Sequence, residues 1–90
     1  MKTKIAMESL AMDLKRVALG YHRGSEKMAI RFSEEAIKRK KEIEYSEVKS
    51  YIQKLLNKIE IILKQKNKDQ IAEDSLLMSI LIQNYTQVFF

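Results

Sequence analysis

Cysteine and proline are absent from this chain of 90 residues, and glycine occurs only twice. Without cysteine, the chain cannot be a disulfide-stapled module, a thiolate zinc site or an iron–sulfur protein. Without proline and with so little glycine, it has few of the residues that form β-hairpin turns. An apolar run near the N-terminus is also missing, because Glu8 and Asp13 interrupt the stretch after Met1–Lys4. No signal peptide is therefore predicted, and we expect a cytoplasmic, all-helical protein.

The size and composition predict one globular domain that covers residues 1–90. Hydrophobic residues make up 46% of the chain, which is typical of a folded protein and not of a disordered one. A chain of this length buries only roughly 60–68% of the surface that its unfolded form exposes, so the core is thin. We therefore expect dense helix packing, a partner, or both.

Apolar residues recur at three- and four-residue steps in four segments, and this spacing predicts amphipathic helices. The four predicted helices span residues 3–22, 26–44, 46–65 and 68–89. Because the turns between them are short, consecutive helices should be antiparallel neighbours. The sequence therefore predicts an all-α fold, an antiparallel (up-down-up-down) four-helix bundle. Three helices, with the second one broken, are the alternative.

Capping residues set the predicted boundaries of these helices. Gly24 can adopt the left-handed conformation that ends a helix, and Ser25 can cap the next one. Ser46 followed by Glu47 predicts the start of the third helix. The segment Asn67–Gln70 resembles a capping box and predicts the start of the fourth helix.

Two apolar patterns indicate which helix faces are buried. In the first helix, Ile5, Met12 and Leu19 form a second apolar seam at seven-residue steps, so this helix is expected to be well buried. In the third helix, Tyr51 and Leu55 belong to the apolar stripe that is expected to face the core.

The segment Ser75–Phe90 contains sixteen residues and no charge, and ten of its residues are apolar or aromatic. It is either a central core helix, a core helix that also contacts a second copy of the chain, or a membrane segment. Sixteen helical residues span only about 24 Å, which is short of the ~30 Å hydrocarbon core of a membrane. Because a helix of a four-helix bundle normally leaves one side to water, a helix that is apolar on several sides needs further cover. We therefore favour a homodimer or higher homo-oligomer. The candidate interface residues are Leu77, Leu81, Val88, Tyr85, Phe89 and Phe90.

The net charge of +5 raises nucleic acid as a possible partner. The one dense basic run is Lys38, Arg39, Lys40 and Lys41, whose side chains are candidate phosphate contacts. A run over one helical turn points in several directions, however, and flanking glutamates neutralise much of it. No helix-turn-helix pattern, RNP-type aromatic motif or glycine-rich clamp accompanies the run.

Arg16 and His22 are the only residues whose spacing suggests catalysis. Their spacing resembles the loose Arg-x(4–6)-His pattern of helical ribonuclease toxins, and this resemblance implies roles for them in proton transfer and phosphate binding. In that family a polar residue usually follows the arginine, whereas here it is Val17. No catalytic residue, metal site or cofactor is predicted. We expect a non-enzymatic scaffold or regulatory module, with a nucleic-acid-binding accessory protein and a ribonuclease-like toxin as alternatives.

Overall fold

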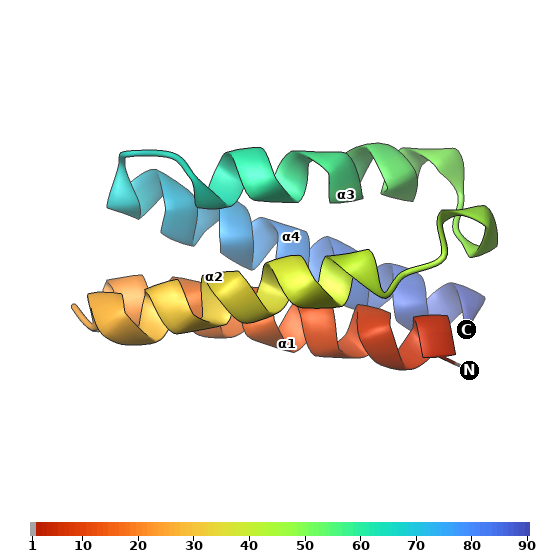
Figure 1. Ribbon diagram of the computed structural model, residues 1–90, viewed down its shortest axis with the longest axis horizontal. Helices are drawn as coiled ribbons and strands as arrows, with labels where there is room; N and C mark the ends of the chain where they lie inside the picture. Colours follow the sequence, from red (N-terminus) through yellow and green to blue (C-terminus); the bar gives the residue numbers. More distant parts are fainter. Residues whose placement is uncertain (1) are drawn as a thin grey trace.

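Four α-helices make up most of residues 2–90, the part of the chain that the computed structural model describes. Their bounds are Lys2–His22 for α1, Glu26–Lys41 for α2, Ser50–Leu63 for α3 and Lys68–Phe89 for α4, with a 3-10 turn, η1, at Tyr45–Glu47. The helices alternate in direction, so both ends of the chain lie at the same end of the bundle (Figure 1). No strand occurs within these residues. The structure thus confirms the predicted all-α, up-down-up-down bundle.

The helix α1 packs closely against both α2 and α4, because small residues lie at the contacts. At Gly20 the backbones of α1 and α2 are so close that an added Cβ would lie 2.8 Å from the backbone nitrogen of Ala29. Between α1 and α4, the Ser79 hydroxyl donates a hydrogen bond of 2.6 Å to the backbone carbonyl of Ala11. Further small residues on these three helices are buried, namely Ala18, Ala36, Ala72 and Ser75.

The helix α3 is held by large side chains instead, and it makes fewer close backbone approaches to α2 and α4 than α1 makes to its neighbours. Its buried residues follow the helical period and are Ile52, Leu56, Ile59 and Leu63. Large aliphatic side chains keep two helix axes further apart than alanine or glycine does. The attachment of α3 therefore depends on a few buried aliphatic groups.

The connection between α2 and α3 differs from the prediction. The predicted helices 26–44 and 46–65 are longer than α2 and α3, and residues 42–49 lie outside both α-helices. Ser46 lies in η1 and does not cap α3, whose N-cap residue is Lys49.

Contacts with distant residues explain this shorter helical content. Ile43 and Val48, near the two ends of this connection, are both buried in the core. The Thr3 hydroxyl stabilises the turn, because it donates to a Glu47 carboxylate oxygen at 2.6 Å and accepts from the Glu44 backbone N–H at 3.5 Å. Hydrophobic burial and these tertiary bonds outweigh the local capping signal.

A buried carboxylate lies on the side of α1 that faces α2. The Asp13 side chain is only 9% exposed, and its Oδ1 lies 3.6 Å from a guanidinium nitrogen of Arg16. Burial raises the pKa of this carboxyl above its ordinary value of 3.8, although the charges of Arg16 and Arg39 act in the opposite direction. The ionised form is therefore less favourable in the folded protein than in the unfolded chain.

We expect Asp13→Asn to be more stable than the wild type at neutral pH. The folded protein holds the Asp13 proton more tightly than the unfolded chain, so stability falls as the pH rises from 3.8 through the raised pKa. Asparagine avoids this loss, and the advantage should vanish below pH 3.8, where both states are protonated. Urea unfolding of the wild type and of Asp13→Asn, at neutral pH and below pH 3.8, measures the difference in their free energy of unfolding. An unchanged difference across this range would contradict the prediction.

Candidate functional site: the outer face of α4

The outer face of α4 is the side of this helix that points away from the bundle core. Its residues are Leu76, Leu77, Ile80, Leu81, Asn84 and Val88, and all of them are exposed. The apolar members range from 39% exposed at Leu76 to 74% exposed at Val88. The opposite side of the helix, which includes Met78, Ile82 and Tyr85, is buried. The helix is therefore apolar on its covered and its uncovered side alike.

The lack of charge distinguishes this face from an ordinary helix surface. A helix at the surface of a bundle normally places charged residues on the side opposite the core. Here no charged residue occurs from Ser75 to Phe90, so water meets leucine, isoleucine and valine side chains instead. Contiguous exposed apolar surface of this kind is typical of interaction sites.

The candidate interface residues fall into three groups in the structure. Leu77, Leu81 and Val88 lie on the outer face, and Phe89 is half-exposed beside it. Tyr85 is buried, and its hydroxyl oxygen accepts a hydrogen bond of 3.0 Å from the Lys49 backbone N–H. Phe90 is partly buried against the core.

A hollow of about 320 Å³ lies between α3 and α4, and we call it the apolar hollow. None of its lining residues is charged: Tyr51, Ile52, Leu55, Leu81, Asn84, Tyr85, Val88 and Phe89. Tyr51 is exposed and Leu55 half-buried, although both belong to the stripe expected to face the core. The outer face of α4 therefore continues onto α3, a contribution that the sequence pattern did not indicate.

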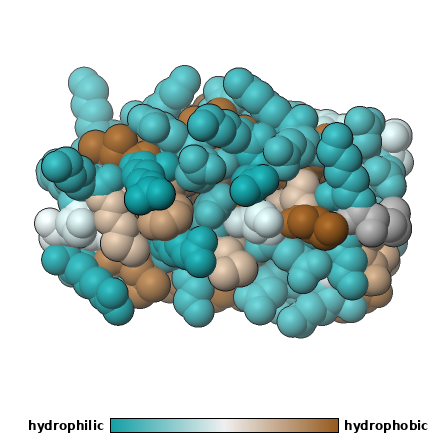
Figure 2. Space-filling model, turned by 60° about the horizontal axis from the view of Figure 1, so that its bottom comes forward, coloured by the Kyte–Doolittle hydropathy of each residue, from teal (hydrophilic) through white to brown (hydrophobic). Residues whose placement is uncertain are grey.

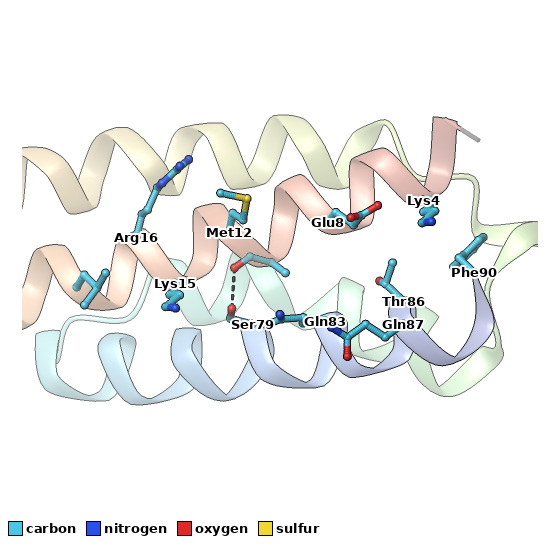
Figure 3. A pocket seen from close by; sticks show the side chains of 12 residues that line it. Lys4, Glu8, Met12, Lys15, Arg16, Ser79, Gln83, Thr86, Gln87 and Phe90 are labelled. Atoms are coloured by element: carbon cyan, nitrogen blue, oxygen red, sulfur yellow. Dashed lines mark hydrogen bonds between the residues drawn. The ribbon is translucent and has the colours of Figure 1, made fainter.

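A second depression of about 570 Å³ lies on the other side of α4, between α4 and α1, and we call it the charged groove. Its residues on α1 include Lys4, Glu8, Lys15 and Arg16, and α4 contributes Gln83 and Gln87 among others. Figure 3 shows Gln83 and Gln87 along α4, to the right of the hydrogen bond that joins Ser79 to α1. The two depressions that flank α4 thus differ in charge.

The helix α1 is well buried and contacts both α2 and α4, as predicted, but its second apolar seam is not what is buried. Ile5 is 64% exposed and Met12 is 54% exposed, and only Leu19 is partly covered. The reason is that α2 and α4 cover the other sides of α1, whereas α3 packs against α2 and α4. Figure 2, in which the underside of the bundle is turned forward, shows a largely hydrophilic face with hydrophobic side chains interspersed.

The basic run of α2 is largely paired with carboxylates. Three of its four cations lie 3.9, 3.3 and 3.7 Å from a glutamate oxygen: Lys38 with Glu35, Arg39 with Glu42 and Lys40 with Glu60. Lys40 is also largely buried, because only 17% of its side chain is exposed. The run does not present four free cations to one phosphate backbone.

The structure does not bring Arg16 and His22 together. The helix α1 continues through Gly20 to His22, so the two side chains point about 120° apart. The Arg16 guanidinium lies 5.2 Å from the ring centre of Phe32 and points toward α2 (Figure 3). Among residues 2–90, no three histidine, aspartate or glutamate side chains gather into a group that could bind a metal. Within the same residues, no helix combines the length and hydropathy needed to cross a membrane.

In comparisons with known proteins, no family model, no curated protein and no solved structure matches this chain. The function must therefore be argued from the site itself. The outer face of α4 and the two depressions beside it are the features that call for a ligand or a partner.

Proposed function

We propose that this protein is a self-associating helical module that binds a second copy of itself through the outer face of α4 and serves as a scaffold or regulator. The observation that carries the proposal is the row of exposed apolar side chains on a helix that has no charge from Ser75 onward. Covering apolar surface contributes roughly 25 cal/mol per Å², so leaving this face in water is unfavourable.

A dimer would bury a modest share of the surface of this chain. A stable interface buries about 800 Å² on each partner, which is about one seventh of the 5764 Å² that this chain exposes. The outer face runs about 18 Å along α4 from Leu76 to Val88, and the apolar hollow widens it toward α3. The two together form an elongated apolar area with polar residues around it, the usual anatomy of an interface.

The charge distribution favours a second copy as the partner. In a two-fold dimer the same patch lies on both sides of the interface. A patch with charge of one sign would meet its own charge across the axis, and this chain carries an excess of positive charge, +5. The outer face of α4 avoids this repulsion because it carries no charge.

Analytical ultracentrifugation over a range of concentrations tests the proposal. The wild type should dimerise at micromolar concentration, and Leu81→Asp should weaken the dimer by about 100-fold or more because a carboxylate would be buried without a partner. Since Leu81 is partly covered within its own chain, Leu77→Asp, at a position 56% exposed, should give the same loss with an unchanged helical circular dichroism spectrum.

Ile61→Asp is the matched control. Ile61 is 70% exposed on α3, on the side opposite the buried stripe of that helix, so the same change in polarity should leave the dimer intact. A wild type that is monomeric at micromolar concentration would overturn the proposal. So would a dimer that survives both Leu81→Asp and Leu77→Asp.

A further inference from the structure

The two depressions beside α4 are not equally suited to a second copy. Docking an uncharged helix into the charged groove would remove water from the side chains of Lys4, Glu8 and Lys15 without providing partners for them. Such desolvation is costly. The apolar hollow has no charged lining residue, so filling it removes water from apolar side chains and from the Asn84 amide but from no charge. Of the two depressions, the apolar hollow is therefore the better seat.

We propose that the second copy docks on the side of α3, with the two α4 helices antiparallel and Leu77 of each copy seated in the apolar hollow of the other. This inference rests on the proposed self-association and specifies its direction and register. It predicts which residues meet across the two-fold axis, and each of these contacts can be tested separately.

The spacing of the outer face supplies the register. Leu77, Leu81, Asn84 and Val88 follow one another at steps of four, three and four residues, the spacing of a coiled-coil seam. The hollow extends along α4 from Leu81 to Phe89. If Leu77 of one copy lies opposite Val88 of the other, Leu77 enters the hollow and Leu81 lies opposite Asn84. A two-fold axis between Leu81 and Asn84 repeats the same contacts in the other half.

The charges at the two ends of the seam support the antiparallel direction. Glu73 lies one turn before Leu77 on an exposed position, and Lys49 lies at the other end of α4, with Nζ 4.2 Å from the ring centre of Phe89. Neither residue forms an ion pair within residues 2–90. Antiparallel docking brings Glu73 of one copy toward Lys49 of the other. A parallel arrangement would bring like charges together at both ends.

Engineered cysteines test the direction, because the chain has no cysteine of its own. The double variant Leu77→Cys with Val88→Cys should form a covalent dimer on mild oxidation. The single variant Leu77→Cys should not, because the two copies of this position would lie about 16 Å apart in the antiparallel dimer, beyond the reach of a disulfide. Within one chain, positions 77 and 88 are also about 16 Å apart, so the double variant cannot close on itself. A single variant that crosslinks as well as the double one would overturn the antiparallel arrangement.

A charge swap tests the side of docking. Glu73→Lys and Lys49→Glu should each weaken the dimer by about 3- to 10-fold, since each pair occurs twice, and the two changes combined should restore the affinity to within about 2-fold. As the matched control, Glu73→Lys combined with Lys4→Glu, on the side of the charged groove, should not restore it. Rescue by Lys4→Glu instead of Lys49→Glu would overturn the inference.

The two failures are distinguishable. If Leu81→Asp dissociates the dimer but neither the crosslink nor the charge rescue appears, self-association stands and only this arrangement is wrong. If the wild type is monomeric, the proposed function fails, and the arrangement fails with it.

Discussion

Replacing Leu56 with alanine should lower the free energy of unfolding by about 2–5 kcal/mol. Leu56 is fully buried at the middle of α3, among Ile52 and Ile59. The cost combines the lost transfer of the side chain out of water with the cavity left behind, which neighbouring groups fill only in part. Since α3 has few close backbone contacts with the rest of the bundle, little else compensates for the loss.

Urea unfolding followed by circular dichroism measures this effect, and Ile61→Ala serves as its control. Ile61 lies on the same helix but is 70% exposed, so its truncation should change the stability by less than about 0.5 kcal/mol. Hydrogen exchange should in addition show reduced protection of the α3 amides in Leu56→Ala before those of α1 are affected. Equal losses for the two variants would contradict the packing described for α3.

Replacing Gly20 with valine should lower the free energy of unfolding by about 3 kcal/mol. Glycine inside a helix normally costs stability, so a larger residue would be expected to help at an open position. At Gly20 an added Cβ would lie 2.8 Å from the backbone nitrogen and 3.0 Å from the Cα of Ala29. Because these atoms belong to the backbone of α2, relief requires the two helices to separate.

Two controls isolate this steric effect in thermal or urea unfolding. Met12→Val places the same β-branched residue on an exposed position of α1 and should cost less than about 1 kcal/mol. Ala29→Gly in the Gly20→Val background should not restore stability, since the nearest atom is the Ala29 backbone nitrogen and not its side chain. A stable Gly20→Val protein would show that α1 and α2 need no such close approach.

Local signals in the sequence predicted several helix boundaries correctly. Gly24 has a φ of 73°, as expected for a left-handed residue that ends a helix, and α2 begins directly after Ser25. The Asn67 side chain caps α4 by accepting a hydrogen bond of 3.0 Å from the Gln70 backbone N–H. Both features need only residues that are near in sequence, and for this reason a pattern can reveal them.

The boundaries between α2 and α3 could not be predicted in the same way. Ser46 is a good capping residue on its own, but its surroundings are set by Thr3, which is more than forty residues away in sequence and hydrogen-bonds to Glu47. The exposure of α4 posed a similar problem, because the sequence shows apolar seams on several sides of this helix. The side of α4 that carries Leu77 and the side that carries Tyr85 are both apolar, and which of them is covered depends on where the other helices lie. Only the packing of the bundle assigns one to the surface and the other to the core.

The pairing of α1 with α4 has a consequence for folding during synthesis. The first helix finds its closest partners in the second and in the last, which begins at Lys68. A nascent chain can therefore form the α1–α2 hairpin early through the contact of Gly20 with Ala29. The side of α1 that carries Ala11, whose carbonyl accepts the hydrogen bond from Ser79, stays uncovered until α4 emerges from the ribosome. Closure of the core is thus a late event that joins distant parts of the chain, and the incomplete chain is the form most prone to aggregate.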